Sequence, residues 1–410
     1  MGIKNRIHRF SSPELQFILI FSIILLQPFR FLHVPYDALM FLTIAFIIIM
    51  ALKRKIQPLP TVFWFILGLY TLSILISTIL SVNIHESIDG IRSEYLKQMA
   101  VFGLLLVTAA TFLEKRNVLL WGFFISGVAM NTIGFFPYFF GTFSTKDHRF
   151  LSLSGSYTRL TYFYVFYVPL LILLLPGRKR KATIAIYLLI ILSLLGTIFT
   201  QTRGGWICVP LALISICVLS KNWRTLAIIA AIITLGSTLV YIVSPSIRKR
   251  IADFREIVDE TGSLGMRKEY RKSALNAFAK NPIFGAGYGK YIFEKIYDKY
   301  KATPSYTELP RSDSHNTYLE ILAQRGIFGF LSTLLLYLYF LEQALILRKT
   351  GGDWGKHLFA YFISVSIAFA VFGLVDNIYV KESGRYLWQV AALIMISPIS
   401  PSKKSEVDEV

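Results

Sequence analysis

Acidic residues and cysteines are scarce in this sequence. Its 410 residues include 24 Asp and Glu against 43 Lys and Arg, and only two cysteines. Cys208 and Cys217 fall on one predicted helix, where their nine positions of separation correspond to about 13 Å at a rise of 1.5 Å per residue. That separation excludes a disulfide between them, so both are interpreted as structural thiols.

Motifs for several kinds of catalytic site are missing as well. There is no HExxH, no cysteine cluster, no DxD pair and no Gly-x-Ser-x-Gly, so neither a metal site nor a nucleophilic triad is predicted. Residues 285–289 read GAGYG, but no strand pattern precedes them and no Lys-Ser/Thr pair follows. They are therefore interpreted as a tight turn and not as a phosphate loop. No cofactor is expected.

Apolar sequence, in contrast, is abundant. The chain is 54% hydrophobic with a mean hydropathy of +0.56, which is typical of an integral membrane protein. A bilayer core of ~30 Å requires roughly 20 apolar residues per helix, and about twelve such runs can be marked. The fold class predicted is thus an all-α polytopic membrane protein. The predicted spans are 14–32, 36–52, 60–82, 95–113, 118–140, 160–176, 182–200, 203–220, 225–243, 317–347, 357–376 and 384–400.

The basic residues predict the orientation of these spans. Lys and Arg cluster in connections of one parity, for example at Lys53, Arg178 and Lys349. By the positive-inside rule these connections are cytoplasmic, and an even number of spans then places both termini in the cytoplasm. The first apolar run has no small-residue cleavage site after it and is expected to remain as an anchor. Membrane orientation therefore accounts for much of the net charge of +19, and no nucleic-acid partner is expected.

One long polar segment, residues 244–316, is predicted to lie on the outer side. Helical spacing of apolar residues recurs in it three times, at 246–258, 266–282 and 291–300. We therefore expect a helical outer loop. The resulting organisation is a bundle of nine spans (1–243), the loop (244–316), three further spans (317–400) and a disordered cytoplasmic tail (401–410).

Several arginines are predicted on the outer side. Arg149 and Arg159 flank the segment FLSLSGSYT, and Arg203 opens the eighth predicted span within TQTRGGW. Positive charge there runs against the orientation rule and indicates an anionic partner. For Arg203 the alternative is a snorkelling side chain beside an interfacial Trp206. In the functional interpretation, the two glycines that follow Arg203 let a ligand approach while the guanidinium holds two anionic oxygens.

A second basic group begins the middle helix of the outer loop. Arg267 is followed by Lys268, Arg271 and Lys272. Such a run can be a solvated helix face that Glu269 partly balances. Basic residues at a helix start nevertheless oppose the helix dipole, which indicates a negative group nearby, such as the phosphate of a lipid carrier or a head group.

His315 stands at the start of the tenth predicted span. Four nearby residues are candidates for the helix N-cap: Ser312, Asp313, Ser314 and Thr317. Thr317 and Glu320 also form a candidate capping box. The positive end of a helix disfavours imidazolium, so a neutral ring suited to general-base catalysis is predicted. The alternative is a surface histidine without a chemical role.

Taken together, these segments resemble a known family. His315-Asn316, nine residues, Gly326, two residues and Gly329 are similar to the signature of the O-antigen ligase family, which O-antigen polymerases and bacterial protein O-oligosaccharyltransferases share in looser form. Residues 266–291 are similar to the family's Arg-led helix and its Pro-x-x-Gly-x-Gly turn. TQTRGGW resembles the segment of the family's other arginine, and RFLSLSGSY, more loosely, its loop before the sixth span. The motifs cover residues 145–335.

The resemblance implies a GT-C-like glycosyltransferase of the bacterial inner membrane with its active site in the periplasm. The reaction that it implies is a metal-independent, inverting transfer of O-antigen polysaccharide from undecaprenyl pyrophosphate to a sugar hydroxyl of the lipid A core. Membrane lipids are further expected partners. His315 would be the base, and Arg203 and Arg267 would bind the pyrophosphate. Further candidates for substrate contact are Arg149, Arg159, Arg271, Asn316 and Asp376.

Other functions remain open at this stage. A polymerase or protein O-oligosaccharyltransferase of the same superfamily would use the same donor with a different acceptor. A twelve-span transporter is the alternative from another class. Transporters place ionisable groups near the bilayer midplane and have two related halves, whereas the predicted spans are nearly free of charge and the halves differ. A transferase is therefore favoured.

Overall fold

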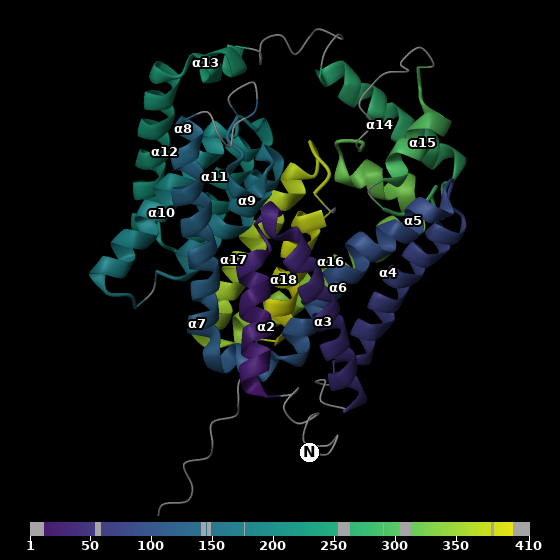
Figure 1. Cartoon of the computed structure of the whole chain (residues 1–410), viewed down its shortest axis with the longest axis horizontal. Coiled ribbons are helices and arrows are strands. Elements are labelled where there is room, and N and C mark those ends of the chain that lie inside the picture. Colours follow the sequence, from purple (N-terminus) through teal and green to yellow (C-terminus); the bar gives the residue numbers. More distant parts are fainter. Residues whose placement is uncertain are drawn as a thin grey trace, which may run out of the picture.

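The computed structural model describes residues 12–53, 59–140, 145, 149–175, 177–252, 263–289, 291–303, 313–378 and 381–396. Within these residues all regular secondary structure is helical (Figure 1), which confirms the predicted all-α class. Among these described residues, seven helices are long and apolar enough to cross a membrane, or up to eight if a pair of helices bent by 70° forms one span. The chain is thus a multi-pass membrane protein, whereas the predicted number of twelve spans is not established. The tail at 401–410 lies outside the described residues.

The helices before the outer loop follow the predicted runs closely. They are α2 (Pro13–Leu26), η1 (Arg30–Leu32), α3 (His33–Leu52), α4 (Thr61–Ile79), α5 (Ile84–Gly90), η2 (Ile91–Tyr95), α6 (Leu96–Val107), α7 (Ala109–Val128), η3 (Ala129–Ile133), α8 (Gly134–Phe139), η4 (Ser152–Ser154), α9 (Tyr157–Leu173), α10 (Arg180–Phe199), α11 (Arg203–Leu219) and α12 (Trp223–Val243). The remaining helices are α13 (Pro245–Ala252), α14 (Ser263–Lys280), α15 (Ile292–Tyr300), α16 (Thr317–Thr350), α17 (Gly352–Phe372) and α18 (Lys381–Ile396).

The predicted fourth span, 95–113, is not one straight helix. The helical segments on either side of Thr108 meet at an angle of 70°. Thr108 itself has φ −110° and ψ 18°, and its hydroxyl donates to the carbonyl of Leu104 at 2.6 Å. Such a bond from a threonine back to the preceding turn favours a bend in a helix. Hydropathy alone could not detect this bend because the sequence is apolar on both sides of it.

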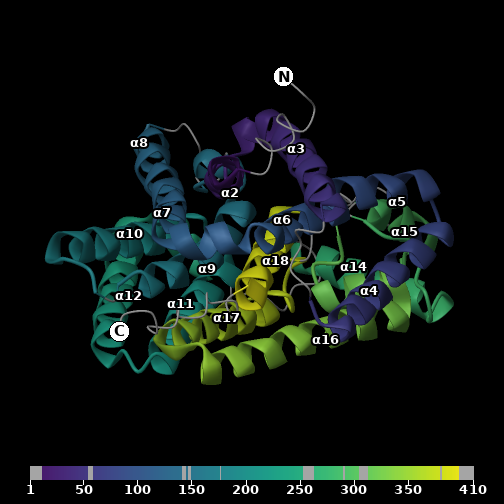
Figure 2. The ribbon, with the colours of Figure 1, turned by 90° about the horizontal axis from the view of Figure 1, so that it is seen from below.

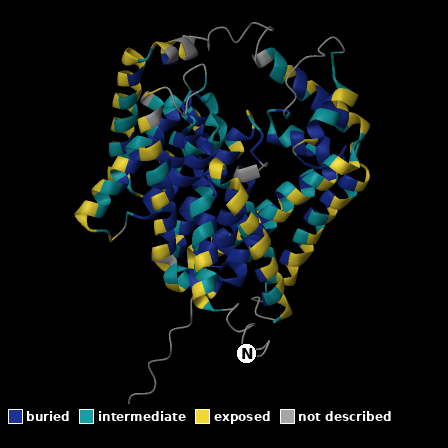
Figure 3. Ribbon diagram, in the orientation of Figure 1, coloured by how far each residue is buried: buried dark blue, intermediate teal, exposed yellow. Residues whose placement is uncertain are grey.

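The core of the bundle forms around α9 and α18. Nearly every residue of α9 from Leu160 to Leu173 is buried, as expected for a helix that is apolar on all sides and enclosed by protein. α18 packs against α6, α16, α17 and α9 in the middle of the molecule (Figure 2). Buried residues concentrate in this centre, and exposed apolar side chains lie on the outer helices (Figure 3). These outer side chains form the surface suited to lipid contact.

Three helices of the predicted outer loop lie at one end of the bundle, with α13 next to α12 and, apart from it, α14 next to α15 (Figure 1). α14 and α15 share a small core with the first turns of α16, in which Tyr270, Phe293 and Ala323 are buried. The carboxylate of Glu269 accepts hydrogen bonds from the backbone N–H groups of Ala302 and Thr303, each at 2.9 Å. Glu269 therefore closes the loop after α15 and does more than balance the basic run. Of the predicted helix 246–258, residues 253–258 lie outside the described residues.

α16 is broken at Gly326, where φ is +64° and ψ is −166°. The glycine-rich turn packs against this break: Ala286 N donates to Ala323 O at 2.9 Å, and Gly287 N donates to Gln324 O at 3.1 Å. Gly285, on the same turn, has φ +72°. The glycines interpreted as a turn thus hold the first part of α16 against the outer loop, and the predicted single long span is two helical pieces.

A buried cation missed by the sequence analysis stabilises the same break. Arg325 is 2% exposed, and its guanidinium donates to the hydroxyls of Thr333 at 2.8 Å and Ser73 at 3.4 Å. The guanidinium carbon also lies 4.9 Å from the ring centroid of Tyr70 on α4. The Arg325 side chain also packs against Gly329 within α16: a Cβ added to Gly329 would lie 2.1 Å from the Cβ of Arg325. We interpret Arg325 as a structural residue that ties α16 to α4.

Replacing Gly326 with alanine is expected to destabilise the protein by about 2–3 kcal/mol or more, because its backbone conformation is available essentially to glycine alone. The added Cβ would also lie 2.3 Å from the carbonyl oxygen of Ile283. The melting temperature of the detergent-solubilised protein measures the effect. Gly68→Ala is the matched control, because nothing lies within 4 Å of a Cβ there and alanine favours a helix. Equal melting temperatures for the two variants would contradict the strain argument.

Candidate active site

His315 lies in the short segment that leads into α16. Asn316 is the N-cap of this helix, because its Oδ1 accepts a hydrogen bond from Leu319 N at 2.9 Å. The prediction of a capping box from Thr317 and Glu320 is therefore wrong, as are the predicted N-caps Asp313, Ser314 and Thr317, while Ser312 lies outside the described residues. Asparagine is as good a cap as aspartate or serine, and the local sequence offered too many candidates to distinguish them.

The backbone at His315 is strained. Its φ is +49°, a conformation that non-glycine residues rarely adopt. Two hydrogen bonds to carboxylates hold it: His315 N donates to Asp313 Oδ1 at 2.9 Å, and Ser314 N donates to Glu320 Oε2 at 2.7 Å. Residues kept in sparsely populated conformations by their surroundings concentrate at functional sites. The turn therefore aims the imidazole in a direction that an ordinary helix start would not allow.

Two carboxylates face the imidazole of His315. Its Nδ1 lies 3.3 Å from Asp376 Oδ1 and 3.3 Å from Asp313 Oδ1. Burial by itself would lower the pKa of His315, but the hydrogen bond with Asp376 and the charges of Asp313 and Asp376 together raise the pKa above its ordinary value of 6.5. The prediction that the helix start keeps the pKa of this ring low is therefore wrong in direction, because it considered only the helix dipole.

Asp376 is held in place by the first turn of α16. Thr317 N donates to Gly373 O at 2.8 Å, and the Thr317 hydroxyl donates to the carbonyl of Asp376 at 3.0 Å. The same hydroxyl accepts a hydrogen bond from Ile378 N at 2.9 Å. Thr317 thus fastens the connection between α17 and α18 to the start of α16. These contacts bring Asp376 beside His315 although the two residues lie far apart in the sequence.

Arg267 and Arg271 extend from α14 to the same place. Arg267 donates to the carbonyl of Val375 at 3.2 Å, and Arg271 donates to the carbonyls of His315 at 3.2 Å and Leu374 at 3.1 Å. Burial and the charge of Arg267 lower the pKa of Arg271 from its ordinary value, although a guanidinium stays charged near neutral pH. The cluster therefore combines a histidine, its carboxylates and two guanidinium groups that can hold anionic oxygens.

Arg203 begins α11, which packs along α17. A Cβ placed on the next residue, Gly204, would lie 3.1 Å from Phe372 and 3.3 Å from Val375. The glycine thus permits close packing of the start of α11 against the end of α17. Because Val375 immediately precedes Asp376, the backbone of Arg203 lies at the same end of the bundle as the His315 cluster.

The other two predicted arginines have different surroundings. Arg149 donates to the carbonyls of Thr200 and Gln201 at 3.1 and 3.3 Å, and its guanidinium carbon lies 3.4 Å from the ring centroid of Tyr157. It therefore organises the connection that carries Arg203. Arg159 instead lines a separate polar cavity between other helices.

Sequence reasoning missed Tyr162 and the role of Asp313. Tyr162 lies within the apolar α9, and its hydroxyl donates to the carbonyl of Asn377 at 3.3 Å. This contact connects α9 to the residue that follows Asp376. A tyrosine in an apolar helix carries no local sign of such a role, and Asp313 was considered only as a cap. Both depend on contacts between segments distant in sequence.

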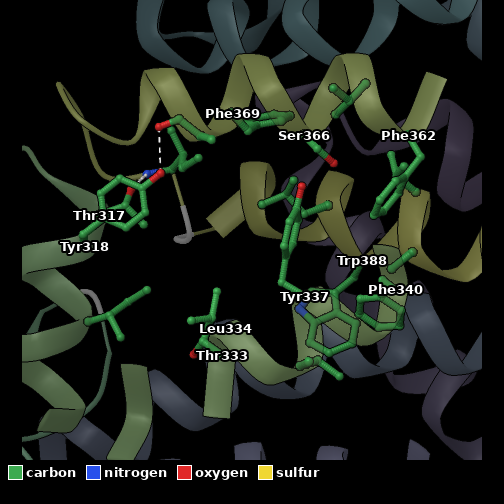
Figure 4. A pocket seen from close by; sticks show the side chains of 18 of the residues that line it. Thr317, Tyr318, Thr333, Leu334, Tyr337, Phe340, Phe362, Ser366, Phe369 and Trp388 are labelled. Atoms are coloured by element: carbon green, nitrogen blue, oxygen red, sulfur yellow. Dashed lines mark hydrogen bonds between the residues drawn. The ribbon is translucent and has the colours of Figure 1, made fainter. Parts of the chain in front are cut away.

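An apolar groove begins beside this cluster (Figure 4). It lies between α16, α17 and α18, has a volume of about 260 Å³, and extends from Thr317 and Tyr318 to Phe340 and Trp388. The Tyr318 hydroxyl donates to the carbonyl of Ala370 at 2.8 Å at the end of the groove that Thr317 lines. Thr317 belongs both to the wall of the groove and to the contacts that hold Asp376, so this end of the groove lies near the His315 cluster. Its lining is suited to a hydrocarbon chain.

The same cluster offers atoms for a metal ion. Among the described residues, Asp313, His315 and Asp376 each present one ligand atom, and the three atoms lie within 4.8 Å of one another. The guanidinium groups of Arg267 and Arg271 lie beside them and would repel a cation. The residue set therefore fits the capture of anions better than that of a divalent ion.

We expect Asp376→Asn to lower the pKa of His315, because the neutral amide removes both the hydrogen bond to a carboxylate and its charge. The titration of the imidazole, followed by NMR on histidine-labelled protein, measures the shift. Asp353→Asn is the matched control, because Asp353 is an exposed residue at the start of α17 and its loss leaves the His315 titration unchanged. An unchanged pKa in Asp376→Asn would exclude the proposed contact.

Comparisons with known proteins agree with the motifs. Residues 188–334 match the family model described as O-antigen ligase. An uncharacterized protein of Haemophilus influenzae is 32% identical over 185 residues, which cover 40% of this chain and 45% of that protein. An O-antigen ligase of Salmonella typhimurium is 25% identical over 190 residues, 46% of each chain. Each alignment thus spans less than half of the relative's length. The resemblance drawn from the motifs is confirmed: residues 188–334 of this chain are similar to the O-antigen ligase family.

Proposed function

We propose that this protein is an O-antigen ligase, which transfers a polysaccharide from undecaprenyl pyrophosphate to a sugar hydroxyl of the lipid A core on the periplasmic side of the inner membrane. The observation that carries the proposal is the arrangement of His315 and Asp376 beside Arg267 and Arg271, near one end of an apolar groove. This arrangement offers a base, anion-binding groups and a place for a lipid in one region.

The proposed reaction is a single displacement. The acceptor hydroxyl forms a bond to the anomeric carbon of the first sugar while the bond from that carbon to the pyrophosphate oxygen breaks, with inversion. Nε2 of His315 receives the hydroxyl proton as general base. The guanidinium groups of Arg203 and Arg267 hold the pyrophosphate, and their hydrogen bonds strengthen as negative charge grows on the leaving oxygen. Because the arginines stabilise the negative charge of the leaving pyrophosphate, no general acid is needed to protonate it.

Asp376 orients the base in this scheme. Its Oδ1 faces Nδ1 of His315 at 3.3 Å, so the Nδ1–H tautomer leaves the lone pair of Nε2 for the acceptor hydroxyl. Only the neutral ring accepts a proton. Because the pKa of His315 is raised, the rate is expected to increase as the pH rises through a value above 6.5.

The apolar groove is proposed to hold the start of the undecaprenyl chain. Its lining between Thr317 and Trp388 is almost entirely apolar, and its position beside His315 would place the attached pyrophosphate within reach of Arg267 and Arg271. The lipid then anchors the donor, and the arginines orient the bond that breaks.

A polymerase or protein O-oligosaccharyltransferase of the same superfamily would use the same donor site, so these two functions differ from the ligase only in the acceptor. A transporter has less support. The buried charge of Arg325 in α16 is held by two hydroxyls and an aromatic ring at a helix break, which indicates a structural residue and not part of a transport pathway.

In vitro transfer tests the proposal. Purified protein, undecaprenyl-pyrophosphate-linked polysaccharide and lipid A core are expected to yield the coupled product, and EDTA is expected to leave the rate unchanged within twofold. Replacing the acceptor by a second lipid-linked repeat or by a peptide tests the polymerase and the protein oligosaccharyltransferase. Product formed with either substitute but none with lipid A core would reject the ligase, and a complete loss with EDTA that Mg²⁺ restores would reject the metal-independent scheme.

A further inference from the structure

A polar cavity distinct from the His315 cluster lies among α2, η1, α3, η2, α9 and α18. Its volume is about 360 Å³, near the lower end of the 300–1,000 Å³ that is usual for small-molecule sites. Arg159 on its wall stands one helical turn before Tyr162, whose hydroxyl donates to Asn377 O at 3.3 Å. α9 therefore borders both the cavity and the segment that carries Asp376.

Positive charge predominates in the lining of this cavity. Lys97 Nζ lies 2.6 Å from Asp37 Oδ1, so this pair adds no net charge. The other charged residues of the lining, apart from His33, are Arg30, Arg159, Arg385 and Glu94. Three arginines against one glutamate leave an excess of two positive charges. A cavity with such a lining attracts anions.

Contacts with neighbouring residues hold two of these arginines, Arg385 and Arg30, in fixed orientations. Arg385 is 7% exposed, and its guanidinium carbon lies 4.8 Å from the ring centroid of Tyr36. Arg30 donates to the carbonyl of Gly155 at 3.3 Å. Gly155 has φ +63°, and a Cβ there would come within 2.7 Å of Arg30 Cδ, so only glycine permits this approach. Preorganised guanidinium groups lose less freedom when they bind an anion.

A neutral polar group also lacks a partner in this cavity. Gln27 is 5% exposed, and its Oε1 accepts a hydrogen bond from Gln389 at 2.7 Å. Its Nε2 has no hydrogen-bond partner. A buried amide donor without an acceptor is unfavourable, so Gln27 contributes an unsatisfied polar group to the wall of the cavity.

We infer that this cavity is a second anion site, which binds a phosphate- or carboxylate-bearing sugar residue of a substrate. The arginines suit the anionic group, while Gln27, Glu94 and the tyrosine hydroxyls of the lining suit sugar hydroxyls. The inference rests on the proposed glycosyl transfer for its biological substrate. The acceptor is the favoured source, because the pyrophosphate of the donor is assigned to the arginines near His315.

A binding experiment tests the site without requiring activity. Glucose 6-phosphate and glucose are the probes, and saturation-transfer NMR on the full-length protein in detergent measures their dissociation constants. Glucose 6-phosphate is expected to bind at least tenfold more tightly than glucose. Arg159→Gln and Arg385→Gln are each expected to weaken it at least tenfold, whereas the double variant Arg203→Gln/Arg267→Gln is expected to change it by less than threefold.

Matched controls separate this result from misfolding. Arg92→Gln removes an arginine of η2 that is 74% exposed and outside the cavity, and it is expected to bind the probe like the wild type. Arg385 is buried, so the melting temperature of each variant is compared, and the partly exposed Arg159 provides the second variant. Unchanged affinity in both Arg159→Gln and Arg385→Gln, or weakening only in the Arg203→Gln/Arg267→Gln variant, would overturn the inference.

Kinetics then distinguish the two sources of the anion. With a phosphorylated acceptor, Arg159→Gln is expected to raise the acceptor KM about 10- to 100-fold, as for a lost hydrogen bond to a charged group, with kcat within threefold. An acceptor from which the phosphates have been removed shows no such rise. A rise in the KM for an acidic donor instead would assign the site to the donor glycan. Absence of activity in the wild type would reject the proposed function but not the binding result.

Discussion

His315→Ala is expected to reduce the rate of glycosyl transfer by about 100- to 10,000-fold, the usual contribution of a general base. Alanine cannot accept the proton of the attacking hydroxyl, so the nucleophile enters the transition state as a neutral alcohol. The loss should appear in kcat, while the KM of the lipid-linked donor changes little because the arginines remain. Single-turnover assays with radiolabelled donor, made with protein of verified melting temperature, measure it.

His357→Ala is the matched control for this substitution. His357 lies on α17 beside Lys221 and Asn222, residues of the predicted cytoplasmic side, and its loss is expected to leave the rate unchanged. If His315→Ala kept more than a tenth of the wild-type rate, the ring would be a positioning residue for the connection between α17 and α18. Another residue would then have to be the general base.

Arg203→Gln is expected to lower kcat by about 100- to 1,000-fold, the effect found when one preorganised donor to a developing oxyanion is removed. Arg203→Lys should recover only part of this loss. Lysine retains the charge but presents it as a point and cannot supply the two parallel N–H groups that match a pair of phosphate oxygens. The kinetics of both variants, measured with the lipid-linked donor, test the assignment of the guanidinium.

Arg92→Gln again serves as the exposed control for the loss of one positive charge, and unchanged kinetics are expected for it. The position of Arg203 at the start of α11 suggests a specific alternative, namely that the side chain only anchors the helix at the membrane interface. In that case Arg203→Lys would show wild-type kcat, because lysine also snorkels. A full rate in Arg203→Lys together with a lowered melting temperature in Arg203→Gln would support the anchor.

The local sequence predicted single helices better than their breaks. Apolar runs corresponded to helices in the bundle, among them α3, α10 and α17, because burial and lipid contact depend on hydropathy averaged over many residues. The bend at Thr108 and the break at Gly326 depend on single residues and on what packs against them. Gly326 was noted as part of a motif, but its conformation became clear only with the carbonyl of Ile283 beside it.

The candidate site shows the same difference. The motifs identified His315 and Arg267, and Arg271 was a further candidate for substrate contact; the structure places the three together. Asp376 was noted without any motif that fixed it. Its distance of 3.3 Å from Nδ1 of His315 arises because Thr317 binds the connection between α17 and α18. The direction of the pKa shift of the ring was misjudged for the same reason, because the carboxylates of Asp376, in the connection between α17 and α18, and of Asp313 outweigh the dipole of α16.

The sequence by itself determined the class of the protein, because membrane insertion depends on runs of apolar residues and on the distribution of basic residues, both of which are local properties. It also determined which chemical groups are available. Only the tertiary structure decided which of those groups meet: it paired His315 with Asp376, directed Arg149 to the carbonyls between α10 and α11, and placed Arg159 and Arg385 on the wall of one cavity. Hydrogen bonds and ion pairs act over a few ångströms in space. The local sequence does not predict the distances between segments that are remote along the chain.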